Sequence, residues 1–163
     1  WLVLALFGGF ISVKVLGVFE PMMNSHRMLL FFTPLIAAMA GNVGVQSSAI
    51  VVQGLANNSI TGSLWNRLLK ELSLSLLNGS ILAVILILGT HFLLGYEFII
   101  GITVSIALLS VIVVASLIGT FIPIVLDKYG VDPALATGPF ITTSNDILGI
   151  IIYFSIARMV LGI

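Results

Sequence analysis

One acidic residue, Asp146, lies deep inside an apolar stretch of the sequence. It stands in the run FITTSNDILG, residues 140–149, which we expect to lie within a helix. A carboxylate at the centre of a membrane-spanning helix costs about 2.5–3.5 kcal/mol on insertion scales, and such residues usually face water or a partner. Asp146 is therefore a candidate for lining an aqueous cation path. A neutral, protonated aspartic acid bonded to a neighbouring helix is the alternative.

The neighbours of Asp146 form a polar, small-residue stripe when they are placed on a helix. At about 100° per residue, one stripe about 100° wide collects Gly138, Thr142, Asn145, Asp146, Gly149 and Tyr153. The pattern predicts that this face, rather than the apolar remainder of the helix, meets water or another helix.

The residues before this helix predict an interrupted start. Asp132 precedes Pro133, the order expected of an N-cap followed by proline at the first helical position. Six residues later, Gly138-Pro139 stops or breaks a helix, because Pro139 cannot donate to a preceding carbonyl. Freed carbonyls at membrane depth are tolerated only against protein or a watery cavity. A simple proline kink is the alternative.

A second apolar segment carries amides and glycines on separate helical faces. Asn42, Gln46, Ala49 and Gln53 share one face, whereas Ala37, Gly41, Gly44 and Ser48 share another. Small residues let helix backbones approach closely, so we interpret the glycine face as a packing face. Uncharged amides in a row suit solvent or a hydrated ion, although interhelical hydrogen bonds would also explain them.

The composition indicates an integral membrane protein. Of the 163 residues, 60% are hydrophobic and only 7% are charged, and the mean hydropathy is +1.27. A soluble domain usually carries about a quarter charged residues. Zero net charge removes the electrostatic case for a nucleic-acid partner, and the absence of cysteine excludes disulfides and thiolate metal sites.

Runs without charged residues divide the chain into elements. Because a spanning helix needs about 20 apolar residues, the chain is predicted to be all-α with five transmembrane helices. Their expected ranges are Trp1–Phe19, Leu29–Leu55, Leu68–Leu94, Phe98–Leu126 and Pro139–Leu161.

The connections are expected to be short and polar. Glu20–Arg27 is predicted to be a turn in which Pro21 stops the first helix, and Ala56–Arg67 is predicted to be a loop. A tight turn is expected at Gly95–Glu97 and a polar link at Asp127–Pro133.

The basic residues give a weak orientation signal. Arg67, Lys70 and Lys128 fall on one side of the membrane, against Arg27 and Arg158 on the other, which favours a cytoplasmic start. A unit this small, without an internal repeat, would form a pathway between copies, so a homo-oligomer is expected.

Enzymatic chemistry is not expected. An intramembrane aspartyl protease needs two carboxylates in its helices. Each chain is expected to bury only Asp146, although a symmetric dimer could bring two together. The predicted second and fifth helices contain no histidine to serve a serine nucleophile, and the zincin spacing His-Glu-x-x-His does not occur.

Two motifs in this order resemble the MgtE magnesium channels: residues 41–46 (GNVGVQ) and residues 142–146 (TTSND). The likeness covers nearly the whole chain, including residues 132–135 (DPAL), the Gly138-Pro139 break and residues 152–154 (IYF). It implies a homodimer in the inner (plasma) membrane, whose second and fifth helices line a central pore. Cytoplasmic N-terminal and CBS domains would precede this chain and close the pore when Mg²⁺ is abundant.

The resemblance also implies roles for single residues. Asp146 matches the pore aspartate that holds hydrated Mg²⁺, and Thr142 and Gly138 match positions on the same helix that contribute polar or carbonyl groups. Gly138 stands where some relatives have an amide side chain. Asp132 matches an acidic residue at the cytoplasmic mouth that shares Mg²⁺ with the regulatory domains. The expected pore-lining residues are Asn42, Gln46, Asn145 and Gly149.

The leading hypothesis is therefore passive Mg²⁺ transport through a homodimeric pore. One carboxylate per subunit with neutral oxygens suits Mg²⁺, which dehydrates reluctantly and keeps several waters. Two alternatives remain open at this point: a non-conducting membrane anchor for a soluble domain, and a proton-coupled carrier of divalent cations that uses Asp146 as a relay.

Overall fold

The computed structural model describes residues 2–60, 63–136 and 138–162, and every regular element in these ranges is helical. This confirms the all-α class. The elements are α1 (Leu2–Val18), α2 (Glu20–Ser25), α3 (Met28–Ala56), α4 (Leu64–Leu88), a π-helical turn η1 (Gly89–Leu93), α5 (Phe98–Lys128), a 3₁₀ turn η2 (Pro133–Ala136) and α6 (Pro139–Leu161).

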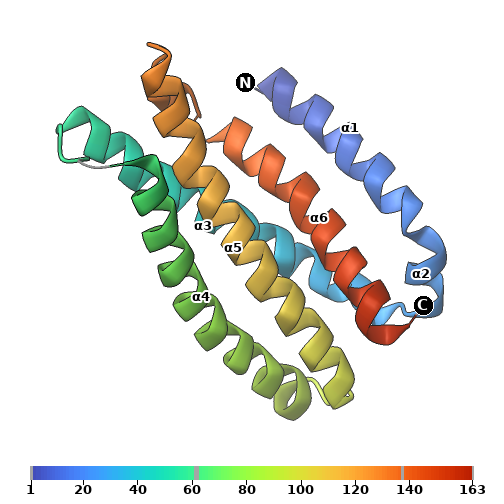
Figure 1. Cartoon of the computed structure of the whole chain (residues 1–163). Coiled ribbons are helices and arrows are strands. Elements are labelled where there is room, and N and C mark those ends of the chain that lie inside the picture. Colours follow the sequence, from blue (N-terminus) through green and yellow to red (C-terminus); the bar gives the residue numbers. More distant parts are fainter. Residues whose placement is uncertain (1, 61–62, 137, 163) are drawn as a thin grey trace.

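The helices are arranged around α5. Figure 1 shows α6 between α1 and α5, with α4 on the other side of α5 and α3 crossing behind. Among the described residues, α4 packs mainly on α5, whereas α3 packs on both α5 and α6. As a result, α3 and α4 meet at one end and diverge toward the other (Figure 1).

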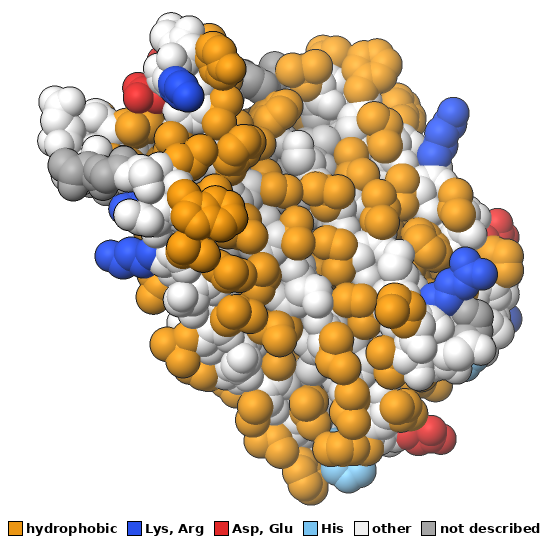
Figure 2. All heavy atoms as spheres, in the orientation of Figure 1, with side chains coloured by type: hydrophobic (Ala, Val, Ile, Leu, Met, Phe, Trp, Pro, Cys, Tyr) orange, Lys and Arg blue, Asp and Glu red, His pale blue; other side chains and the backbone are white. Residues whose placement is uncertain are grey.

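Four helices are long and apolar enough to cross a membrane: Met28–Ala56, Leu64–Leu93, Phe98–Lys128 and Pro139–Leu161. The fifth apolar helix, α1, has 17 described residues and is shorter. Figure 2 shows hydrophobic side chains across the middle of one face, while charged side chains gather toward its margins. This distribution matches a protein whose central belt faces lipid.

The core forms where α3, α5 and α6 meet. Close approach of α3 and α5 depends on Gly119, where a Cβ would overlap the Gly44 carbonyl oxygen. Tyr153 and Phe154 of α6 are fully buried. The Tyr153 hydroxyl donates to the Leu29 carbonyl at 2.8 Å, and Phe154 stacks on Phe19 with ring centroids 5.1 Å apart. The first contact holds α6 against α3, and the second holds it against the junction between α1 and α2.

Two connections differ from those expected. Glu20–Ser25 is a short helix rather than a turn, with Pro21 in its first turn, where a missing N–H costs no helical hydrogen bond. The chain instead breaks at Phe19, whose backbone leaves the helical conformation.

The second difference concerns the start of α4, which begins at Leu64 rather than Leu68. The Ser63 side chain caps it by accepting from the Asn66 N–H at 3.2 Å. Arg67 therefore lies on the helix and not in a loop. Glu71 in turn lies two turns inside α4, where its side chain faces Ser47 of α3.

Candidate cation-binding cavity

A polar cavity of about 560 Å³ lies between α3 and α6. From α6, it is lined by Thr142 and Asp146, whose carboxylate is the one charged group among its lining residues. From α3, it is lined by Ala37, Ala38, Gly41, Asn42, Val45, Gln46 and Ala49. The two motifs that sequence analysis singled out are therefore neighbours in space, although about 100 residues separate them.

Asp146 is half-buried and makes no hydrogen bond or ion pair with any other described residue. The bond to a neighbouring helix that a purely structural aspartic acid would make is thus not present in the described part of the chain. An unpaired carboxylate at this depth needs water or a cation to offset its desolvation.

The chain changes direction at Gly138, between the short turn η2 and the start of α6. Asp132 accepts a hydrogen bond from the Ala134 N–H at 2.9 Å, so it caps the short turn η2. Gly138 has a φ of +79°, a conformation that side chains rarely tolerate, and α6 follows with Pro139 at its first turn. The backbone therefore turns sharply at Gly138 rather than bending as a kinked helix.

Thr142 lies one turn into α6, beside the cavity. Its hydroxyl donates to the Gly138 and Pro139 carbonyls, at 3.2 Å in each case. Because its proton points back along the helix, the hydroxyl oxygen can accept hydrogen bonds from water in the cavity. The Gly138 carbonyl is occupied by this bond and by the Thr142 N–H at 3.0 Å.

The opposite wall leaves room around the carboxylate. A Cβ at Gly41 would lie 3.8 Å from the Thr142 methyl group and 3.9 Å from Asp146 Oδ1. Asn42 and Gln46 are exposed on this wall, and their amides bond to no other described side chain or backbone group. The amides are therefore free to bind water or an ion's hydration shell.

Two residues expected to line a pore lie elsewhere. Asn145 is 1% exposed, and its amide donates to the Ala40 carbonyl at 3.4 Å. Gly149 is buried against Ala40 of α3 and Val111 of α5. The stripe that sequence analysis found on α6 thus divides between the cavity, at Thr142 and Asp146, and the packed core, at Asn145, Gly149 and Tyr153.

Asp132 is also separate from the cavity. It is exposed in the link between α5 and α6, at the end of the molecule where α1 begins (Figure 1). Within the described ranges, no three carboxylate or imidazole groups come together as a metal-chelating cluster. One carboxylate among neutral oxygens provides outer-sphere contacts for an ion that keeps its waters.

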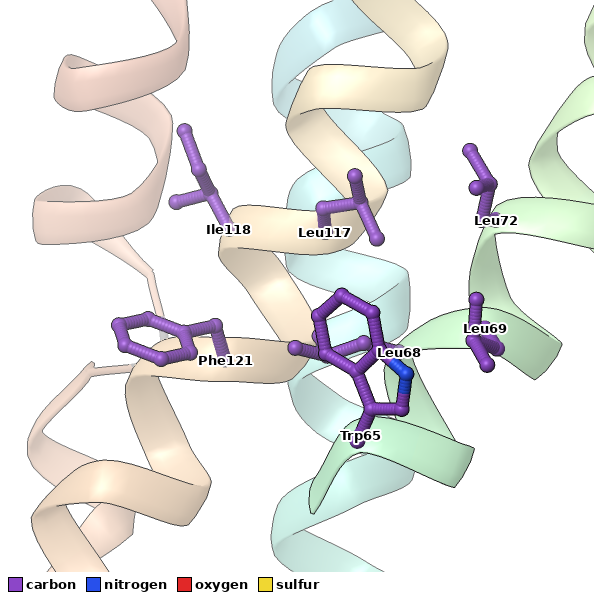
Figure 3. Close-up of a pocket in the computed structure, with 7 residues that line it drawn as sticks. All are labelled: Trp65, Leu68, Leu69, Leu72, Leu117, Ile118 and Phe121. Carbon is purple, nitrogen blue, oxygen red and sulfur yellow. The ribbon is translucent and has the colours of Figure 1, made fainter.

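A second, apolar pocket of about 300 Å³ lies between α4 and α5. Figure 3 shows Trp65 and Phe121 bordering it with the neighbouring leucines, and its lining contains no polar atom except the indole nitrogen. Its side chains therefore offer no oxygen ligand for a cation.

The fold and cavity define an all-α, multi-pass membrane protein with a polar intramembrane cavity centred on one carboxylate. The MgtE family model, described as "divalent cation transporter", matches residues 33–156. The chain therefore belongs to the MgtE family of divalent cation transporters.

Curated relatives agree with this assignment. The chain is 38% identical over 96% of its length to "Magnesium transporter MgtE" of Bacillus subtilis (strain 168). It is 37% identical over 98% of its length to the protein of that name from Enterococcus faecalis, and 32% identical over 99% to that of Thermus thermophilus. The chain spans about a third of the length of these relatives, covering 35%, 35% and 36% of them respectively.

Proposed function

We propose that this chain forms a membrane pathway for Mg²⁺, in which hydrated ions pass between two copies of the cavity built around Asp146. The observation that carries the proposal is the unpaired Asp146 carboxylate facing free amides across a cavity of about 560 Å³. The family supports a divalent cation as cargo, and the printed names of the relatives support magnesium.

The shape of the site supports a homodimer. In one chain the cavity is open on its outer side, where Ala38, Asn42, Gln46 and Ala49 are exposed. Polar groups on an open face would meet lipid, where they are costly. A second copy placed with its own α3 and α6 opposite would close the cavity into a central pore. Two Asp146 carboxylates would then face one axis.

Passage of Mg²⁺ requires binding that is favourable and still reversible. Mg²⁺ gives up inner-sphere waters reluctantly, so the carboxylates would attract the ion through its waters. The Asn42 and Gln46 amides and the Thr142 hydroxyl would orient those waters. A site made of outer-sphere contacts lets the ion enter and leave, which conduction needs.

The charged residues support an orientation of the pore in the membrane. The basic residues favour the end carrying Arg67, Lys70 and Lys128 as the cytoplasmic one, in the inner (plasma) membrane. Asp132 lies at that end, exposed to solvent. There it would share Mg²⁺ with cytoplasmic regulatory domains, and Gly138 would shape the mouth of the pore through its backbone.

Flux through the chain in sealed vesicles tests this function. Vesicles containing the wild-type chain should take up Mg²⁺ down its gradient faster than empty vesicles, without an imposed pH gradient. Correctly folded protein that conducts no divalent cation would show that the chain is an anchor. Uptake that occurs only with a proton gradient would identify a proton-coupled carrier instead.

A further inference from the structure

A second polar cavity lies beside the first, between α3, α4 and α5. Its volume is about 500 Å³. Asn42 and Gln46 line both cavities, so the two spaces share a wall of amides. The cavity exists because α4 packs on α5 and diverges from α3, as Figure 1 shows.

Glu71 supplies the one charge among the residues that line this second cavity. It accepts a hydrogen bond from the Ser47 hydroxyl across the gap, with Ser47 Oγ to Glu71 Oε1 at 2.8 Å. Arg67 lies one turn earlier on α4, within reach at the i, i+4 spacing, although an acidic residue that follows the basic one is the weaker order for such a pair. Nevertheless, Glu71 forms no ion pair within the described residues and is turned toward α3.

Neutral oxygen groups surround this carboxylate. Ser75 and Asn78 follow Glu71 along the same face of α4, and Ser116 adds a hydroxyl from α5. Ser75 donates to the Leu72 carbonyl at 3.0 Å and Ser116 to the Val113 carbonyl at 3.1 Å. Both hydroxyl protons are therefore used, and their oxygen lone pairs are available as acceptors.

The geometry points to a second divalent-cation site in this cavity, with Glu71 as its anionic ligand and the shared amides as its link to the Asp146 cavity. Carboxylate, amide and hydroxyl oxygens are the ligands that hard divalent cations prefer. Six waters occupy about 180 Å³ in the liquid, so a cavity of about 500 Å³ holds a hydrated ion. No basic side chain lines it to repel a cation.

This inference builds on the proposed function, because a cation beside Asp146 reaches Asn42 and Gln46 and is then at the edge of the Glu71 cavity. A carboxylate there would hold cations next to the pathway and raise their local concentration. The two sites remain separable experimentally, since Glu71 and Asp146 lie on different helices and line different cavities.

Binding of Mn²⁺ to the purified chain, followed by electron paramagnetic resonance, tests the site in an Asp146→Asn background. In that background, the result does not depend on the proposed pore site. Asp146→Asn protein should still bind Mn²⁺, and adding Glu71→Gln should weaken that binding by at least about tenfold. Glu97→Gln, which neutralises an exposed carboxylate in the turn before α5, is the matched control and should change nothing.

Glu71→Asp keeps the charge but shortens the side chain, so its Mn²⁺ affinity should fall between those of the parent and Glu71→Gln. If Glu71→Gln does not fold, as judged by circular dichroism, Glu71→Asp decides the question, because weaker binding supports the site and unchanged binding overturns it. Where Glu71→Gln folds, Mn²⁺ affinity equal to that of the Glu97→Gln control overturns the proposal.

Discussion

Gly41 and Asp146 face each other across the α3–α6 cavity, and a Cβ at Gly41 would lie 3.9 Å from Asp146 Oδ1. This distance is an ordinary van der Waals contact, so a methyl group fits without moving the helices. It would, however, occupy space that water needs around the carboxylate. The glycine therefore matters for access to the cavity and not for packing.

Gly41→Ala should consequently lower Mg²⁺ uptake severalfold while leaving the fold intact. Alanine is favoured over glycine in a helix by about 1 kcal/mol, so the free energy of unfolding should not fall. Gly9→Ala in α1 is the control, since a Cβ there would meet nothing within 4 Å. Equal uptake by the two variants would show that space beside Asp146 is unimportant.

Gly44→Ala should act on stability instead. A Cβ at Gly44 would overlap the Asn145 side-chain amide and lie 2.9 Å from the Ile141 side chain. Overpacking of this kind costs about 1–3 kcal/mol, which should appear as a lower midpoint in denaturant unfolding. Gly17→Ala, where a Cβ has no neighbour within 4 Å, should unfold at or above the wild-type midpoint. A Gly44→Ala midpoint as high as that of Gly17→Ala would refute the packing assigned to Gly44.

Tyr153→Phe removes the buried hydroxyl that donates to the Leu29 carbonyl at 2.8 Å. Loss of this bond should lower the free energy of unfolding by about 1–2 kcal/mol. Tyr129→Phe is the matched control, because Tyr129 is 78% exposed and should tolerate the change. If both variants unfold alike, the Tyr153 bond does not hold α6 against α3.

Two variants at Asp132 distinguish a helix-capping role from a regulatory role. Asp132→Ala removes the acceptor for the Ala134 N–H and should cost about 1 kcal/mol in unfolding free energy, whereas Asp132→Asn keeps a capping oxygen. In a full-length protein with cytoplasmic domains, Asp132→Asn should weaken inhibition by cytoplasmic Mg²⁺. Inhibition identical to wild type at every Mg²⁺ concentration would leave Asp132 as a cap alone.

The sequence predicted the all-α membrane class because apolar runs without charged residues that are long enough to span a bilayer are typical of transmembrane helices. It also identified Asp146, since a lone charge in such a run is costly. The start of α4 was harder to find, because the polar composition of residues 57–63 predicts a loop, which was extended to Arg67. The available signal was Ser63, a residue type favoured at the N-cap, whose side chain accepts from the backbone N–H of Asn66 in the structure.

Helical periodicity also could not predict which residues of the polar stripe on α6 line the cavity and which are buried in the core. Thr142, Asn145 and Asp146 fall within one sector of the helix, yet Asn145 is buried against Ala40 while Asp146 lines the cavity. That division depends on where α3 packs, which the sequence of α6 does not contain. The Glu71 cavity was missed for a related reason, since it arises from the divergence of α3 and α4.

Mg²⁺ uptake by vesicles containing the Asp146→Asn chain tests the central claim most directly. Asparagine keeps the size and polarity of the side chain but removes its charge, and Asp127→Asn, at an exposed position near the end of α5, is the matched control. We predict that Asp146→Asn lowers uptake by at least about tenfold, the loss expected when one cation loses about 1.4 kcal/mol of interaction, while Asp127→Asn transports like the wild type. Wild-type uptake by folded Asp146→Asn protein would contradict the assignment of Asp146 as the residue that holds the ion.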